Sequence, residues 1–209
     1  MTDARARILG GIRAALGPRD DAAVAARLAH PPAHARVPVD ADPVAHFLSK
    51  LALPTLSASG ERVTSRAAVP AAVAAYLAQA GLPARAAVVP ALAGLDWGGI
   101  AVHDTLDRDE PAAVSLAAAA IAETGSLVFA SAPDAPTLFN FLPLHHLAVV
   151  AAADIVPHLE DAWAAVRARG PLPRNVNLVT GTSGTADIEA LLVRGAHGPR
   201  FLHVLVVDG

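Results

Sequence analysis

The chain has 209 residues, of which 54% are hydrophobic and 17% are charged, and its formal net charge is −3. This composition indicates one compact domain with a sizeable core rather than a disordered chain. The weakly acidic balance, without clustered basic residues, argues against a nucleic-acid partner. Because there is no cysteine, disulfides, a cysteine nucleophile and a thiolate-bound iron–sulfur cluster are excluded.

The N-terminal part predicts two helices separated by a linker. Residues 3–16 place apolar side chains on one helical face, without the continuous apolar core of a signal peptide. Residues 30–40 contain three prolines, which favour an extended linker. Asp42 can cap a second helix that has Pro43 in its first turn and runs to Leu51.

These features predict the domain organisation. Residues 1–50 are expected to form a helical appendage with a proline-rich linker, and residues 51–209 to form the main α/β domain. The longest uncharged apolar stretch, residues 112–122, is rich in alanine and shorter than the ~18 residues that span a bilayer. We therefore expect no transmembrane segment and a cytoplasmic location.

In the main domain, short apolar segments alternate with helical ones. This alternation predicts an α/β fold with a mostly parallel sheet and helices on both faces, and ligands at the carboxyl ends of the strands. Residues 113–122 are compatible with either a helix or a strand. The predicted strands are residues 61–65, 85–89, 100–103, 126–130, 147–151, 175–179 and 201–207, and the predicted helical segments are 69–80, 137–142 and 154–169, the last capped by Asp154.

Glu123 stands at the end of an apolar stretch, directly before the turn Thr124-Gly125. A carboxylate at the rim of a sheet can act as a nucleophile or a base if its neighbours tune it. The alternative, which the spacing alone favours, is a Glu that hydrogen-bonds its own turn. If parallel strands gather such ends at one rim, Glu123 lies within reach of His145 or His146.

His145 and His146 directly precede the apolar strand predicted for residues 147–151. If the strand begins at these histidines, the two imidazoles point to opposite faces and cannot easily bind one metal ion. One of them can serve as a proton shuttle. The alternative is one exposed histidine and one buried, hydrogen-bonded histidine, and the sequence leaves both interpretations open.

A loop rich in glycine and hydroxyl side chains follows the strand predicted for residues 175–179. Such a loop can present backbone N–H groups to a carboxylate or phosphate, although it can equally cap its own backbone. It lacks the Gly-Lys-Ser/Thr ending of a P-loop and the third glycine of a dinucleotide fingerprint, and no recognised metal-ligand spacing is present. The candidate ligand-binding residues are Gly181, Ser183, Gly184, Thr185, Asp187, His197 and Arg200.

Five segments occur here in an order that resembles the lactate-utilization protein C family, also called the LUD domain. The segments are AIAETGSLVF, LPLHHLAVV, DIVPHLEDAW, TGTSGTADIE and VRGAHGPRFLHVLVVDG. The ordered likeness covers roughly residues 113–209. The paired histidines are a departure, since the family usually has one histidine there.

The resemblance implies a fold similar to the NagB/RpiA/CoA-transferase-like fold and a role in L-lactate utilization, the oxidation of lactate to pyruvate. It also implies partner proteins that carry iron–sulfur clusters. We therefore expect a subunit without its own cofactor or redox centre, which acts as a binding or scaffold component. The alternatives are an enzyme similar to CoA-transferases, with Glu123 as nucleophile or base, and a free-standing small-molecule sensor.

Overall fold

A computed structural model describes residues 2–17, 20–30, 35–186 and 192–209. The chain divides into two compact units, Met1–Arg36 and Val37–Gly209. This division lies before residues 37–50, which the sequence analysis assigned to the appendage.

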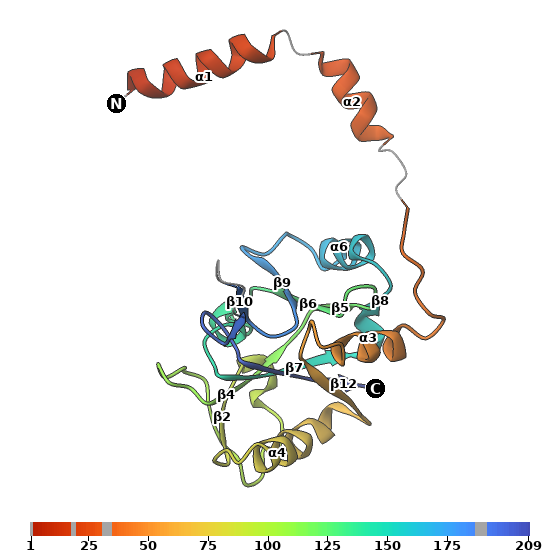
Figure 1. The fold of residues 1–209 in the computed structure, drawn as a ribbon, viewed down its shortest axis with the longest axis vertical. Helices are drawn as coiled ribbons and strands as arrows, with labels where there is room; N and C mark the ends of the chain where they lie inside the picture. The colour runs from red at the N-terminus through yellow and green to blue at the C-terminus, as the bar shows by residue number, and fades with distance from the viewer. Residues whose placement is uncertain (1, 18–19, 31–34, 187–191) are drawn as a thin grey trace. The chain divides into compact units, whose positions relative to one another are not determined.

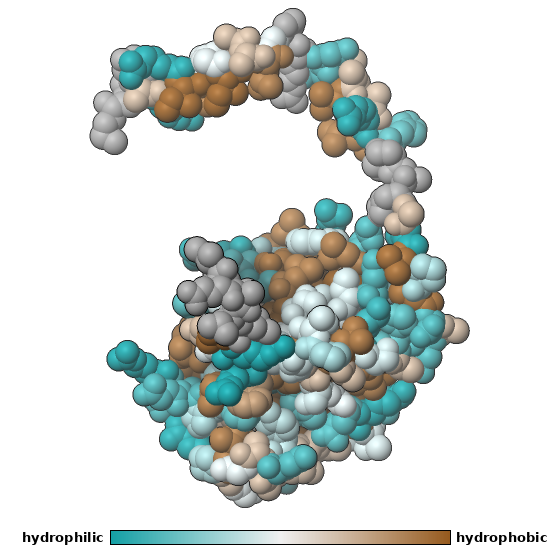
Figure 2. Space-filling view, viewed as in Figure 1, coloured by the Kyte–Doolittle hydropathy of each residue, from teal (hydrophilic) through white to brown (hydrophobic). Residues whose placement is uncertain are grey.

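The first unit contains helices α1 (Thr2–Leu16) and α2 (Asp21–Ala29). The predicted helix over residues 3–16 is confirmed by α1, whose apolar side chains Ile8 and Leu16 are 63% and 78% exposed. Figure 2 shows apolar surface as a stripe along one side of this helix. Tertiary packing therefore contributes little to α1 within this unit.

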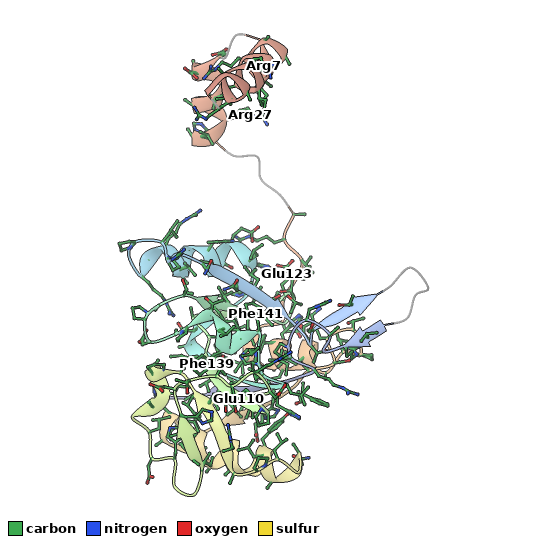
Figure 3. All side chains as sticks on the ribbon, turned by 90° about the vertical axis from the view of Figure 1, so that its left-hand side faces the viewer. Arg7, Arg27, Glu110, Glu123, Phe139 and Phe141 are labelled. Carbon is green, nitrogen blue, oxygen red and sulfur yellow. The ribbon has the colours of Figure 1, made fainter. Side chains whose placement is uncertain are left out.

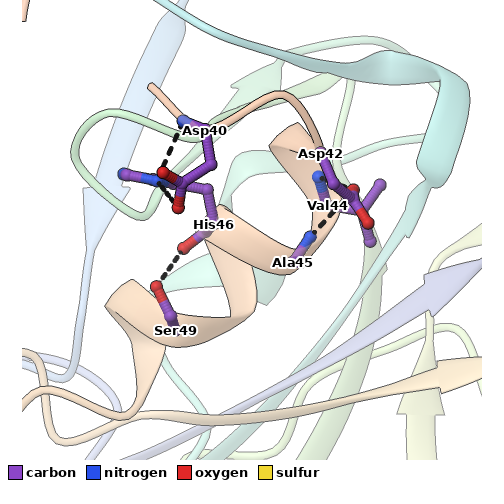
Figure 4. A network of polar contacts seen from close by, with 6 residues as sticks. All are labelled: Asp40, Asp42, Val44, Ala45, His46 and Ser49. Carbon is purple, nitrogen blue, oxygen red and sulfur yellow. Dashed lines mark hydrogen bonds and ion pairs between the residues drawn. The ribbon is translucent and has the colours of Figure 1, made fainter. Parts of the chain in front are cut away.

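Helix α3 (Pro43–Leu51) belongs to the second unit. Its start is as predicted, because the Asp42 carboxylate accepts hydrogen bonds from the N–H groups of Val44 and Ala45 (Figure 4). Val44, Phe47 and Leu51 are buried in the core of the main domain. This burial explains why the domain boundary precedes α3 instead of following it.

The main domain is built on a six-stranded, wholly parallel sheet, which confirms the predicted α/β class (Figure 1). The strand order is β1-β12-β7-β4-β2-β3. Side chains of β7 alternate between the two faces, because Leu147 and Val149 enter one core cluster whereas Ala148 and Val150 enter another. The bounds are β1 Ser59–Val63, β2 Arg85–Val88, β3 Ala101–His103, β4 Ala112–Leu116, β7 His145–Ala151 and β12 Phe201–Val207.

A second, four-stranded sheet in the order β8-β5-β6-β9 was not predicted. The ambiguous segment 113–122 supplies a strand to each sheet, β4 to the first and β5 to the second. Backbone N–H groups of the two residues between these strands, Ala117 and Ala118, donate to Val149 and Val128 respectively, and so link the sheets. The bounds are β5 Ala119–Ile121, β6 Ser126–Ala130, β8 Ile155–Val156 and β9 Val176–Thr180, and a hairpin adds β10 Gly184–Ala186 and β11 Leu192–Arg194.

Helices cover both sheets. Helix α4 (Val69–Gln79) packs on one face of the parallel sheet, while α3 and the second sheet cover the other. The remaining helical elements are the 3₁₀ turns η1 Arg66–Ala68, η2 Thr137–Asn140 and η3 Ala152–Asp154, and the helices α5 Pro90–Ala93 and α6 Leu159–Ala168. No helix in the described ranges is long and apolar enough to cross a bilayer.

The start of α6 differs from the prediction. The helix begins at Leu159 after His158, not at Asp154, because residues 155–156 form β8 instead. Ile155 is buried, and β8 pairs with β5, with the Ala122 N–H donating to the Val156 carbonyl. Pairing between distant segments therefore overrides the local helical pattern.

Candidate functional site

A cavity of about 280 Å³ opens where β7 and β12 begin and β9 ends, between the two sheets. We call it the His146 cavity. Its polar side chains are Asn140, His146, Thr180, Thr182, Ser183 and His197, and its other lining residues are Phe141, Leu178, Val179, Gly181, Gly198, Pro199 and Leu202. The sequence analysis had named four of these lining residues as candidates: His146, Gly181, Ser183 and His197. They come from three separate segments of the sequence, which the fold brings to one place.

His146 lies at the inner end of this cavity and is wholly buried. Its Nε2 is 2.6 Å from the Ser115 hydroxyl, and its ring packs against Phe129 with centroids 5.4 Å apart. Its Nδ1 is buried without a hydrogen-bond partner in the described part of the chain. Burial lowers the pKa of His146 to about 3, so the imidazole is neutral at physiological pH.

His145 faces the opposite side of the sheet, as predicted for a strand that begins at the histidines. The Tyr76 hydroxyl lies 2.9 Å from its Nδ1, and the Phe201 ring stacks on its imidazole. Burial lowers the pKa of His145 as well. The contacts of the two histidines separate their roles, because His146 alone of the pair lines the cavity.

Glu123 lies in the turn after β5 of the second sheet (Figure 3). Its carboxylate is 3.0 Å from Nδ1 of His158, the residue that precedes α6. The structure gives Glu123 this partner, while His145 and His146 contact Tyr76 and Ser115. The expected common rim does not form, because the histidines begin a strand of the parallel sheet whereas Glu123 follows a strand of the other sheet.

A line of hydroxyl groups connects the turn after Glu123 with the cavity. The Thr124 hydroxyl lies 2.6 Å from that of Ser126, which lies 2.6 Å from that of Thr180. Thr180 lines the His146 cavity. The turn that follows Glu123 and the strand end that precedes Gly181 are thus linked through hydrogen bonds. Glu123 itself is not among the residues that line this cavity.

The backbone of the Gly181 loop is held by the domain itself. Gly181 has a φ of +74°, and the N–H groups of Thr182 and Ser183 donate to the carbonyls of Leu56 and Pro199. These two N–H groups are therefore occupied and cannot bind an anion. Arg194 donates to the Thr182 hydroxyl at 2.8 Å but does not itself line the cavity.

The other candidate residues of this region occupy different places. Gly184 and Thr185 lie in β10, where Thr185 pairs with Val193, and Asp187 lies outside the described residues. The Arg200 guanidinium stacks over the Phe201 ring at 5.6 Å. Neither Thr185 nor Arg200 lines the His146 cavity.

Comparison with known proteins places this architecture in a family. Lactate utilization protein C of Deinococcus radiodurans is 32% identical over 154 residues, which cover 68% of this chain and 70% of that protein. Residues 111–207 match the family model described as the LUD domain. The chain belongs to the LUD-domain family. This finding confirms the resemblance that the sequence motifs carried.

Other relatives of this LUD-domain chain agree. Lactate utilization protein C of Bacillus licheniformis is 33% identical over 119 residues, or 54% of this chain and 50% of the relative, so the chain matches about half of that protein's length. The crystal structure of a DUF162 family protein from Deinococcus radiodurans superimposes with a TM-score of 0.61 and 27% identity, covering 81% of this chain and 99% of that one. The matched LUD-domain segment contains all the residues that line the His146 cavity.

The sequence analysis of this LUD-domain chain missed Asn140, Thr180 and Thr182. Asn140 is 4% exposed and stands in the apolar run Leu138–Leu144, and a buried amide in such a run is a signal that the sequence does contain. Thr180 ends β9 and gives no comparable signal, because only the pairing of β9 with β6 brings it to the cavity. In the described ranges, no group of three or more acidic or histidine side chains is arranged to hold a metal ion.

The LUD-domain cavity is thus lined by both polar and apolar groups, with no Asp, Glu, Lys or Arg among its described lining residues. Asn140, Ser183 and His197 can donate hydrogen bonds to a carboxylate, and the neutral His146 can contact a hydroxyl or a carbonyl oxygen. This donor set suits the binding of a small polar organic molecule.

Proposed function

We propose that this LUD-domain protein is a ligand-binding component of an L-lactate utilization system, without a redox centre of its own. The names of its relatives support the lactate role. The cavity at His146 is the observation that carries the proposal, because it collects hydroxyl and amide donors beside a buried imidazole whose Nδ1 has no hydrogen-bond partner among the described residues. The partners in this proposal are proteins that carry the iron–sulfur clusters, since this chain has no cysteine to bind one.

The ligand in this proposal is L-lactate or its oxidation product, pyruvate. The carboxylate is bound by the Asn140 amide and the Ser183 hydroxyl, because hydrogen bonds to an ionised acceptor are stronger than those between neutral groups. The oxygen on the second carbon points toward His146 Nδ1 and removes the cost of a buried, unpaired nitrogen. Because the imidazole is fully covered, its neighbours shift slightly when the ligand enters.

Ligand-induced thermal stabilisation tests this proposal. Millimolar L-lactate or pyruvate should raise the melting temperature, because a ligand that binds only the folded state stabilises it by mass action. Ser183→Ala should lose most of this shift, since the hydroxyl lines the cavity. Thr185→Ala is the matched control, because this exposed hydroxyl lies two residues away and does not line the cavity. An unchanged melting temperature with both acids would overturn the proposed ligand site.

A further inference from the structure

A second cavity, of about 520 Å³, adjoins the His146 cavity. It is formed by the three loops that precede β4, β7 and β12, which are neighbours in the parallel sheet. Its walls combine polar and apolar groups, and the apolar side chains Leu142 and Leu144 are exposed by 36% and 46%. The lining residues are Arg108, Asp109, Glu110, Pro111, Phe141, Leu142, Pro143, Leu144 and residues 195–198.

Charged residues line one part of this second cavity: Arg108 and Asp109 are exposed, whereas Glu110 is buried. The Glu110 side chain is wholly buried, and its carboxylate lies 2.9 Å from His103 Nε2 and 3.6 Å from the Arg85 guanidinium. The apolar part of the lining includes Phe141, Leu142 and Leu144, which are partly exposed. An apolar group that packs on these three side chains is therefore removed from water.

The two cavities meet at Phe141, His197 and Gly198, which line both. Gly198 packs closely on the opposite wall, since a Cβ there would lie 3.1 Å from the Ser183 Cβ. His197 is exposed, so its side chain can change rotamer without disturbing the core. A ligand seated at Ser183 is thus next to the boundary of the second cavity.

Lactate is small for this space. Its six heavy atoms occupy roughly 100 Å³ at the packing density of organic solids, whereas the His146 cavity alone has about 280 Å³ and adjoins a larger cavity whose lining includes the apolar side chains of Phe141, Leu142 and Leu144. We propose that the site accepts 2-hydroxy acids with a longer apolar chain, whose polar head lies in the His146 cavity and whose chain extends into the second cavity. This inference rests on the proposed function and adds the chemical class of ligand.

The test is a chain-length series measured by isothermal titration calorimetry. L-lactate, 2-hydroxybutanoate and 2-hydroxyhexanoate are titrated into the full-length protein, with hexanoate as the analogue that lacks the hydroxyl. Each methylene that becomes fully buried should tighten binding by up to about fourfold. Hexanoate should bind more weakly than 2-hydroxyhexanoate, because it cannot present a hydroxyl to His146.

The variant Leu144→Asn tests where the apolar chain of the ligand lies, because it makes the wall of the second cavity more polar at a partly exposed position. It should remove the higher affinity of 2-hydroxyhexanoate relative to lactate and leave the affinity for lactate within about twofold of the wild-type value. Leu172→Asn is the matched control, since Leu172 is 61% exposed and lines neither cavity, and it should retain the gain.

The outcomes separate this inference from the proposed function. If lactate binds but the longer acids bind no more tightly, or if the gain survives in Leu144→Asn, the second cavity has no role in ligand binding. If neither lactate nor the longer acids bind, the proposed function fails and the inference fails with it. If hexanoate equals 2-hydroxyhexanoate, the head group is not recognised and the assigned orientation is wrong.

Discussion

Replacing His146 by glutamine should flatten the acid dependence of folding stability. The pKa of His146 falls from 6.5 to about 3 on folding, because the buried imidazole loses its hydration. Below pH 6.5 the unfolded chain therefore binds a proton that the folded chain excludes. Stability is fully present above this pH and is lost as the pH falls toward 3.

The expected loss for this one group is about 2 kcal/mol between pH 8 and pH 5, since each unit of pKa difference corresponds to about 1.4 kcal/mol. Burial lowers the pKa of His145 and His203 too, and both add to the loss in the same direction. Only the contribution of His146 disappears in His146→Gln. The difference between the two proteins, rather than the total loss, therefore isolates this histidine.

Urea denaturation at pH 8 and pH 5 measures this difference. At pH 8, His146→Gln should start from a lower free energy of unfolding, because it loses the imidazole contact with Ser115. On acidification to pH 5 it should then lose about 2 kcal/mol less than the wild type. The exposed His30 provides the control variant His30→Gln. If His146→Gln and the wild type lose equal stability between the two pH values, the buried neutral imidazole described for the cavity is refuted.

Three further predictions concern the turn, the carboxylate and the metal content. In urea denaturation, Gly181→Ala should lower the free energy of unfolding by about 1–3 kcal/mol, because φ is +74° and a Cβ would lie 2.7 Å from the Leu56 Cα. The control Gly94→Ala, with open space around it, should be nearly neutral, and equal effects of the two variants would contradict this prediction. The free energy of unfolding of Glu123→Gln should stay within about 1 kcal/mol of that of the wild type. The variant should also restore growth of a deletion strain on L-lactate, because Glu123 pairs with His158 and does not line the cavity. A growth defect in a folded variant would instead support chemistry at Glu123. Protein purified anaerobically should be colourless and lack stoichiometric iron, since no cysteine is present, and elemental analysis with a visible spectrum would show otherwise.

Local signals in the sequence were sufficient for much of the fold. Asp42 and Pro43 predicted the start of α3, and the apolar run at residues 147–151 predicted the central strand β7. Both signals depend on neighbouring residues alone. The adjacent histidines were correctly expected on opposite faces, because the alternation of a strand requires it once the strand begins at His145.

Features that depend on distant pairing were missed. The chain passes from β4 in the first sheet to β5 in the second sheet over only two residues, Ala117 and Ala118. An alanine run does not mark such a break. The same pairing converts residues 155–156 into β8 and shortens the helix predicted from Asp154. No local pattern encodes these contacts.

The candidate site shows the same division. Composition drew attention to the Gly181 loop, and Gly181 and Ser183 do line the cavity. The sequence could not show that the N–H groups of Thr182 and Ser183 donate to Leu56 and Pro199, since Leu56 is more than a hundred residues away. Glu123 and His158 likewise meet only because β5 and β8 are adjacent.

Complementation of a deletion strain with a cavity-filling variant tests the central claim most directly. Ser183→Phe places a large side chain in the His146 cavity, whereas Thr185→Phe adds the same group at an exposed position on β10 that does not line it. Both variants should fold, as judged by their melting temperatures, and support growth on glucose. The account predicts that Thr185→Phe restores growth on L-lactate and Ser183→Phe does not. Full growth on L-lactate with a folded Ser183→Phe protein would contradict a ligand-binding role for this cavity in lactate utilization.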